Sequence, residues 1–195
     1  MNRFTQSPCE VAIPVCFGKS MRWDDNFTLY SVPRKLTRES STTKLKIGDP
    51  APMFTATITD GSTANLANYL GKKLVLYFYP MDDTPGCTKQ ACSLRDHYSE
   101  IRAQGAAVLG VSTQDAASHQ RFTAKYQLNF PLMVDADGAI GKAYGAVGDG
   151  FLGTAMNLMG MASRITFIID ENGHIAHIID RPNCANHAEE VLKLL

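Results

Sequence analysis

The sequence predicts an α/β domain in which a central β-sheet is flanked by helices, and two observations indicate this class. Over residues 46–195, apolar runs of strand length alternate with segments whose apolar residues recur at helical spacing. Near the end of the chain, two strand-like runs flank the pair Asn172-Gly173, which favours a tight antiparallel hairpin. Parallel βαβ units are therefore expected to end in a hairpin and a covering helix.

Several runs have the length and composition of strands, because they are rich in β-branched, aromatic and other apolar residues. The turn signal Asp60-Gly61 ends the first run, and Pro131 precedes the fourth. The expected strands are Met53–Ile58, Leu74–Tyr79, Ala107–Ser112, Leu132–Val134, Arg164–Asp170 and His174–Ile179.

A helix is expected directly after the second strand. Thr84 is a natural N-cap for it, and Pro85 would occupy the first helical position, where a missing N–H costs nothing. Five residues then recur at steps of four and three and predict one buried stripe. The stripe consists of Cys87, Ala91, Leu94, Tyr98 and Ile101.

Two further helices are expected. Asp115–Tyr126 begins with residues suited to capping. A closing amphipathic helix is expected from about Asn186 to Leu195, with Glu189 three residues after Asn186 in the pattern of a capping box. No internal repeat is visible, so residues 46–195 are interpreted as one domain.

Composition limits the classes of function. The chain has 195 residues, 45% of them hydrophobic, which is enough for one substantial core. Its formal net charge of zero gives no electrostatic case for nucleic acid or an anionic membrane as a partner. The five cysteines form no disulfide framework of the kind found in small secreted domains, so a cytoplasmic location is expected. They are Cys9, Cys16, Cys87, Cys92 and Cys184.

Residues 1–45 differ in kind from the rest and are interpreted as an N-terminal extension. They carry seven basic and four acidic residues, a net charge of +3. Their longest apolar run, Val11–Phe17, is broken by Pro14 and is too short for a membrane span or a signal peptide. Frequent Ser and Thr are typical of an organelle transit peptide, for example to the chloroplast, but Asp24-Asp25 and Glu39 argue against one. A disordered extension is favoured, and a targeting segment is the alternative.

Cys87 is placed to be a reactive thiol. Unfilled backbone N–H groups and the positive end of the helix dipole favour the thiolate in the first turn of a helix. An isolated cysteine is more often a small buried hydrophobe. Here the second thiol, Cys92, and the strand-to-helix position favour redox chemistry instead.

The spacing of Cys87 and Cys92 has a geometric consequence. Five residues of regular helix give a rise of about 7.5 Å and a rotation of about 140°, so the two Cα atoms lie roughly 8 to 9 Å apart on different faces. A disulfide needs Cα atoms within about 7 Å. If the two thiols bond during a reaction, the first turns of the helix must unwind. The alternative is that Cys92 is a bystander on the outer face, beside Ser93, Arg95 and Asp96.

The segment Phe78–Cys92, with the sequence FYPMDDTPGCTKQAC, resembles the active-site signature of the peroxiredoxins, most closely the bacterioferritin-comigratory-protein or Q-type group. The resemblance covers nearly all of residues 46–195 and nothing before them. It continues through Lys46–Pro52, Val108–Ser112, Phe130–Leu132, Ala143–Gly145 and Arg164–Asp170.

This resemblance implies a thioredoxin-like fold and roles for five residues. Cys87 would be the peroxidatic cysteine and Cys92 the resolving cysteine. Thr84 would hydrogen-bond at the reaction centre, Pro80 would shield it from water, and Arg164 would stabilise the thiolate and orient the peroxide. Physical chemistry supports two of these roles independently, because a threonine hydroxyl can donate to sulfur or to a peroxide oxygen and arginine is a permanent cation.

The sequence departs from the family pattern at two positions without losing a catalytic group. Met81 replaces a commoner lysine-like residue, and Gln90 stands where Glu is usual. Asp82 and Asp83 lie close to the nucleophile, and since their charge would oppose thiolate formation, both are expected to point towards solvent.

No metal site and no bound cofactor are expected. The five histidines form no HxH or HExxH pattern, and Cys184 with His187 lacks further ligands. The Gly- and Met-rich segment 148–161 leads into Arg164. Packing is favoured over substrate gating for this segment, because methionine is an adaptable filler.

The expected function is a monomeric thiol peroxidase that reduces hydrogen peroxide and small organic hydroperoxides. A Cys87 sulfenic acid would condense with Cys92, and thioredoxin or a similar dithiol would reduce the disulfide. One alternative is a protein-disulfide oxidoreductase, although the Cys-x-x-Cys pattern typical of that class is absent. The other is a redox-sensing interaction protein that uses the same thiol chemistry as a signal.

Overall fold

The computed structural model describes residues 43–148 and 161–195. The expectations for residues 1–42, and for most of the Gly- and Met-rich segment, lie outside these residues. The elements in chain order are β1 (Thr55–Thr57), β2 (Thr63–Asn65), the 3-10 helix η1 (Leu66–Tyr69), β3 (Lys73–Phe78), α1 (Pro85–Asp96), α2 (Tyr98–Ala103), β4 (Ala106–Ser112), α3 (Ala116–Tyr126), β5 (Leu132–Val134), α4 (Ala139–Ala143), β6 (Ile165–Ile169), β7 (Ile175–Asp180) and α6 (His187–Leu192).

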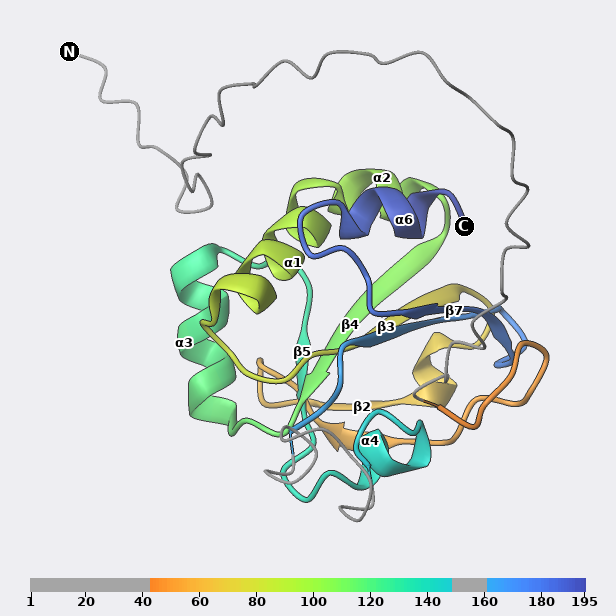
Figure 1. The fold of residues 1–195 in the computed structure, drawn as a ribbon, viewed down its shortest axis with the longest axis horizontal. Coiled ribbons are helices and arrows are strands. Elements are labelled where there is room, and N and C mark those ends of the chain that lie inside the picture. The colour runs from red at the N-terminus through yellow and green to blue at the C-terminus, as the bar shows by residue number, and fades with distance from the viewer. Residues whose placement is uncertain (1–42, 149–160) are drawn as a thin grey trace, which may run out of the picture. The chain divides into compact units, whose positions relative to one another are not determined.

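A five-stranded sheet with the order β5-β4-β3-β6-β7 forms the centre of the fold (Figure 1). β3 pairs in parallel with β4, and β4 with β5, whereas β6 runs antiparallel to both β3 and β7. The turn between β6 and β7 contains Gly173, whose φ of +84° suits glycine. The predicted α/β class, the parallel units and the terminal hairpin are therefore confirmed.

The two faces of the sheet carry different layers. In Figure 1, helices α1, α2 and α6 lie on one side, and the β1–β2 hairpin and α4 lie on the other. Alternate residues of β3 serve the two faces, as the pleat of a strand requires. Leu74, Leu76 and Phe78 join the main apolar core, whereas the ring of Tyr77 lies edge-on against His187 of α6.

The first strand and a short helix in the second half of the domain differ from the expectation. The first strand is shorter than Met53–Ile58, because it pairs only with the unpredicted strand β2 through a turn. In that turn Asp60 accepts hydrogen bonds from the amide and hydroxyl of Ser62, at 2.9 and 2.6 Å. The sequence did not indicate α4 either. Its first turn is held by the buried carboxylate of Asp135, which accepts from the amides of Ile140 and Gly141.

The expected helix through Cys87 is divided in two. His97 has φ −106° and ψ 12°, and its ring Nδ1 lies 3.1 Å from the carbonyl oxygen of Ser93. A side chain that bonds a carbonyl of the preceding turn competes with the helical ladder. α1 therefore ends at Asp96, and Tyr98 is only half-buried, whereas the rest of the expected stripe is buried.

The closing helix is also shorter than expected. It spans His187–Leu192 with Asn186 at the N-cap, but the Asn186 side chain caps no amide within the described residues. The expected capping box is therefore wrong. Glu190, rather than Glu189, contacts the preceding loop, because its carboxylate accepts from the amide of Asn183 at 3.1 Å.

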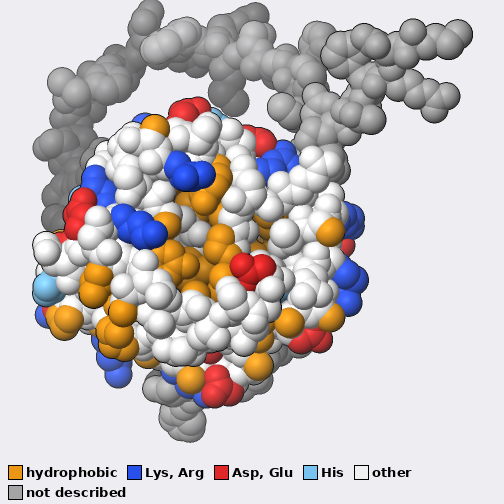
Figure 2. All heavy atoms as spheres, turned by 180° about the vertical axis from the view of Figure 1, so that it is seen from behind, with side chains coloured by type: hydrophobic (Ala, Val, Ile, Leu, Met, Phe, Trp, Pro, Cys, Tyr) orange, Lys and Arg blue, Asp and Glu red, His pale blue; other side chains and the backbone are white. Residues whose placement is uncertain are grey.

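Charged side chains of both signs are spread over the face opposite to that of Figure 1. Figure 2 shows apolar side chains gathered in the middle of this face, with lysine or arginine and acidic side chains beside them. None of the described helices is both long and apolar enough to cross a bilayer.

Candidate active site

Cys87 lies where β3 gives way to α1. Thr84 is the N-cap of α1, with the extended conformation of φ −87° and ψ 150°, and its carbonyl accepts from the amide of Thr88 at 2.8 Å. Pro85 occupies the first turn, as predicted. Cys87 is a free thiol and only 1% exposed. The start of the helix thus holds a buried thiol close to unfilled backbone N–H groups.

Arg164 is the cation at this thiol. It directly precedes β6, whose first residue, Ile165, pairs with Phe78 at the end of β3. This pairing brings the guanidinium to the start of α1, where Nη2 lies 3.4 Å from Cys87 Sγ. Gly86 permits the approach, because a Cβ at that position would lie 3.2 Å from Nη2 and 3.8 Å from the sulfur of Cys184. The structure therefore brings Cys87 and Arg164 together.

Gln90 contacts the other side of the same guanidinium, and the sequence did not indicate this. Its Oε1 accepts a hydrogen bond from Arg164 Nη1, and its Nε2 lies 3.1 Å from Nδ1 of His187. Nε2 of His187 lies 3.0 Å from Oγ1 of Thr166. Gln90, His187 and Thr166 are each 0% exposed. A Gln and a His that are 97 residues apart give no local signal; only their fully buried meeting identifies them.

Burial, and to a lesser degree the charge of Arg164, lowers the pKa of His187 to about 3. The ring is therefore neutral near pH 7. On the same face, the ring of Tyr77 lies 6.0 Å from that of His187, and burial raises the Tyr77 pKa well above its usual value. Arg164 thus has neutral neighbours on the side away from Cys87.

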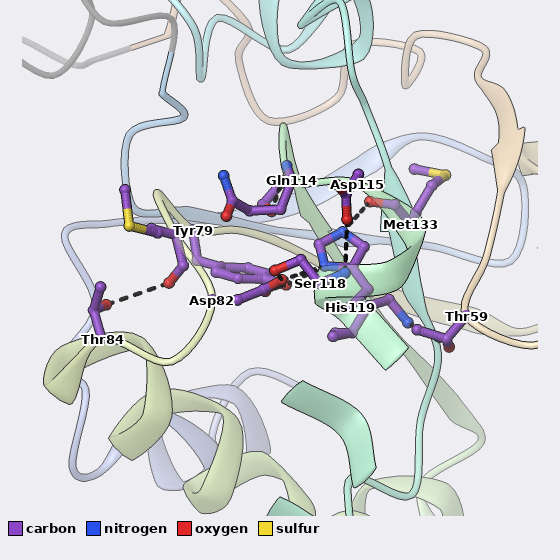
Figure 3. A network of polar contacts seen from close by, with 12 residues as sticks. Thr59, Tyr79, Asp82, Thr84, Gln114, Asp115, Ser118, His119 and Met133 are labelled. Atoms are coloured by element: carbon purple, nitrogen blue, oxygen red, sulfur yellow. Dashed lines mark hydrogen bonds and ion pairs between the residues drawn. The ribbon is translucent and has the colours of Figure 1, made fainter. Parts of the chain in front are cut away.

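Asp82 does not point towards solvent, which corrects the expectation from the sequence. It is 7% exposed and accepts hydrogen bonds from the hydroxyls of Tyr79 and Ser118, both at 2.7 Å. Its Oδ2 also lies 2.9 Å from Nδ1 of His119 (Figure 3). Burial would raise the pKa of Asp82, but the hydrogen bond and charge of His119, with the two hydroxyls, outweigh it and lower the pKa. Ser118 and His119 come from the distant helix α3, so the sequence near Asp82 did not reveal these two partners.

Asp83 is exposed, as expected, and forms a salt bridge with Lys125 at 2.7 Å. Its backbone has a φ of +57°, which is uncommon for a residue other than glycine. Asp82 and Asp83 together tie the loop before Thr84 to helix α3 from two sides.

Neither Thr84 nor Pro80 makes a hydrogen bond to the Cys87 thiol among the described residues. The Thr84 hydroxyl donates to the carbonyl of Met81 at 3.3 Å rather than to Cys87, and it makes no capping bond in the first turn. Pro80 is half-buried and lies two residues after the end of β3. Their expected roles remain predictions.

Cys92 is 3% exposed, so it does not lie on an exposed outer face as the bystander alternative required. Both Cys87 and Cys92 belong to the intact helix α1, and Cys87 is free, so the two are not bonded to each other. The assignment of Cys92 as the resolving cysteine stays a prediction.

In the part of the chain that the structure describes, no group of three or more His, Cys, Asp or Glu side chains is placed to hold a metal ion. The site is accordingly a thiol, a cation and the buried amide and imidazole that contact the cation.

Comparison with known proteins agrees with this arrangement. Residues 47–178 match the AhpC/TSA family. The chain is 40% identical over 152 residues to peroxiredoxin Bcp of Escherichia coli, covering 77% of this chain and 96% of that protein. It is 40% identical over 153 residues to peroxiredoxin Q, chloroplastic, of Oryza sativa subsp. japonica, covering 78% and 67%.

Solved structures show the same likeness. The bacterioferritin comigratory protein of Xanthomonas campestris superposes with a TM-score of 0.67 at 30% identity, covering 77% of this chain and 95% of that one. The predicted thioredoxin-like fold and the resemblance to the peroxiredoxins are both confirmed. Together with the family match, these findings show that the chain belongs to the AhpC/TSA family, as a thiol peroxidase of the peroxiredoxin Q/Bcp type.

Proposed function

We propose that Cys87 is the peroxidatic cysteine of this peroxidase and that Arg164 is the cation that activates it. The observation that carries the proposal is the 3.4 Å contact between Arg164 Nη2 and the buried free thiol at the start of α1. A cation at this distance favours the thiolate and the negative charge that develops on the peroxide oxygen. The thiolate attacks one peroxide oxygen, the O–O bond breaks, and the leaving oxygen takes a proton and departs as water or alcohol. Cys87 is left as a sulfenic acid.

Peroxides are the substrates of this family, and we propose that this chain accepts both hydrogen peroxide and small organic hydroperoxides. The bacterioferritin comigratory protein of Xanthomonas campestris is described with alkyl peroxide reduction activity. Its 30% identity and shared fold support the same substrate class here. Rates measured with hydrogen peroxide and with a small alkyl hydroperoxide would test this part of the proposal.

Cys92 is proposed as the resolving cysteine. Its thiol attacks the Cys87 sulfenic sulfur, a disulfide forms and water leaves; a dithiol, proposed to be thioredoxin, then reduces the disulfide by exchange. Since both cysteines lie in one continuous helix from Pro85 to Asp96, the first turns must unwind before the sulfurs can meet. Thr84 and Pro80 complete the proposal. The Thr84 hydroxyl would turn from the Met81 carbonyl to the peroxide, and Pro80 would limit the entry of water.

The test is a single-turnover peroxide assay followed by coupled turnover with thioredoxin. We expect Cys87→Ser to abolish peroxide consumption. Cys92→Ser should consume one equivalent of peroxide at the parental rate and then fail to recycle with thioredoxin. Peroxide consumption by Cys87→Ser at the parental rate would show that the assignment is wrong.

The burial of Cys87 argues against a protein-disulfide oxidoreductase, because a thiol that is 1% exposed is poorly placed to attack a disulfide on another protein. A redox-sensing role without turnover would be recognised if thioredoxin failed to support multiple cycles.

We also propose that the enzyme is monomeric and cytoplasmic. A plastid is the alternative location, since the rice relative is a chloroplastic protein. Light scattering of the full chain would test the first proposal. The second would be tested by the location of a fluorescent fusion with and without residues 1–45, because a targeting segment would move the fusion into an organelle.

A further inference from the structure

Three fully buried polar side chains from three separate elements form one hydrogen-bonded chain behind Arg164. Gln90 comes from α1, Thr166 from β6 and His187 from α6. The direction of each bond follows from the donors available. A guanidinium only donates, so the Gln90 group facing Arg164 is the carbonyl oxygen. The Gln90 amide nitrogen therefore faces His187 and donates to its Nδ1.

This order fixes the state of the imidazole. Nδ1 accepts from Gln90, so the ring hydrogen is on Nε2 and points to Oγ1 of Thr166. The lowered pKa of His187, about 3, agrees with a ring that accepts at Nδ1. A protonated ring would place two donors against each other at Gln90. The groups around the ring are Gln90, Thr166 and Tyr77, with Arg164 as the nearby charge.

We propose that His187 is a positioning residue of this peroxidase: through Gln90 it holds the guanidinium of Arg164 against Cys87, and through the same bond it restrains the folded form of α1. The proposal rests on the proposed roles of Cys87 and Arg164. His187 touches neither the thiol nor the peroxide, and it acts only through Gln90.

The second half of the proposal follows from the position of Gln90 in the chain. Gln90 lies between Cys87 and Cys92, in the part of α1 that must unwind before those two sulfurs can bond. Unwinding pulls the Gln90 amide away from His187, which stays with α6. The Gln90–His187 bond therefore promotes the peroxide step, which needs Arg164 in place, and opposes the disulfide step, which needs α1 open.

The experiment compares variants of the full chain in stopped-flow measurements of both steps. His187→Phe and Gln90→Met remove the bond while keeping most of the side-chain volume. His187→Asn returns an acceptor to the position of Nδ1. His177→Phe, a half-buried histidine on β7, is the matched control for the exchange of His for Phe.

We expect His187→Phe and Gln90→Met to slow sulfenic acid formation at Cys87 about tenfold, since a small displacement of a positioned group is costly. Disulfide formation in the same variants should become about fivefold faster, which corresponds to the loss of one buried hydrogen bond. His187→Asn should recover most of the first rate, and His177→Phe should leave both rates at the parental values.

Parental rates for both steps in His187→Phe and Gln90→Met would overturn the proposal. Equal slowing of both steps would overturn it too, because the proposal requires faster disulfide formation, whereas equal slowing indicates a general loosening of the fold. If His187→Phe does not fold, Gln90→Met and His187→Asn give the same comparison. The Cys87→Ser variant separates the two proposals: if it abolishes peroxide consumption and the other variants behave like the parent, only the positioning role of His187 is lost.

Discussion

Two buried histidines lie on either side of the segment that carries Cys87, and their surroundings differ in charge. His119, on α3, faces the carboxylate of Asp82, which also accepts from two hydroxyls. His187, on α6, faces an uncharged amide and an uncharged hydroxyl. The first cluster contains a carboxylate, whereas the second offers Arg164 only neutral hydrogen-bond partners among the described residues.

The difference indicates that one cluster anchors the loop before α1 and the other positions the cation proposed to activate Cys87. A buried carboxylate close to a thiol would oppose thiolate formation, so a carboxylate in this region needs its own donors. Three side chains contact the Asp82 carboxylate, and their bonds to it hold the loop before α1 in place. A carboxylate in the position of Gln90 would partly offset the positive potential that Arg164 exerts at Cys87. Gln90 holds the same guanidinium through a neutral oxygen.

The largest expected effect is that of Arg164→Ala on the peroxide step. Removing the cation from the neutral cluster should slow sulfenic acid formation by about 10²-fold or more, as for other preorganised donors. Rapid-quench trapping of the sulfenic acid with dimedone measures this rate directly. Asp82→Asn provides the contrast, because it should change the same rate far less. An unchanged rate in Arg164→Ala would remove the activating role from this cluster.

Asp82→Asn should instead lower the free energy of unfolding by about 3 kcal/mol, since it replaces a buried, hydrogen-bonded carboxylate oxygen by an NH2 group that faces donors. Urea unfolding followed by circular dichroism gives this value. Asp83→Asn is the control on the exposed neighbour and should change stability little, because solvent screens that pair. Equal losses in the two variants would contradict the distinction between a buried anchor and a surface ion pair.

The two clusters should also lose stability in different pH ranges. The pKa of His187 is lowered in the folded protein to about 3, so the unfolded chain takes up the proton first, near pH 6.5. The free energy of unfolding should therefore begin to fall as the pH drops below about 6.5. The pKa of Asp82 is also lowered, so its contribution is present above the usual carboxyl pKa of about 4 and is lost only as the pH falls further.

Unfolding curves at several pH values would separate the two ranges. His187→Asn should flatten the pH dependence between pH 6.5 and 4, and Asp82→Asn should flatten it below about pH 4. If the free energy of unfolding of His187→Asn still falls between about pH 6.5 and 4, another group causes the pH dependence in this range.

The smallest effect is expected for Gly86→Ala. The added Cβ would lie 3.2 Å from Arg164 Nη2, so the guanidinium should shift by a few tenths of an ångström and the peroxide step should slow a few-fold. Replacing glycine in a helix should at the same time add about 0.5 to 1 kcal/mol to the stability. Thermal unfolding and single-turnover rates on the same samples would show a higher stability together with a slower peroxide step. A faster peroxide step would contradict the close contact between Gly86 and Arg164.

Prediction from sequence worked best where the signal is local. The strands around β3 and β4 are continuous apolar runs, and the first turn of α1 is marked by Thr84 and Pro85, so both the sheet and the position of Cys87 were predictable. Arg164 was found only through its family resemblance, because a lone arginine before a strand is ambiguous. The expectation for Asp82 was wrong and the contact of Gln90 with Arg164 was missed for one physical reason. The environment of a polar side chain depends on partners such as His119 and His187, which lie far away in the sequence.

The break in the helix at His97 limits how far an opening of α1 can spread. Hydrogen bonds propagate along a continuous helix, so melting one end of a long helix would weaken its remainder. Here α2 begins afresh at Tyr98 with its own hydrogen bonds, and Ile101 anchors it at 0% exposure. α1 can therefore open as a small cooperative unit of its own, while α2 and the sheet stay closed. In the proposed reaction of Cys92 with Cys87, the unwinding is then confined to helix α1, and the hydrophobic core need not open.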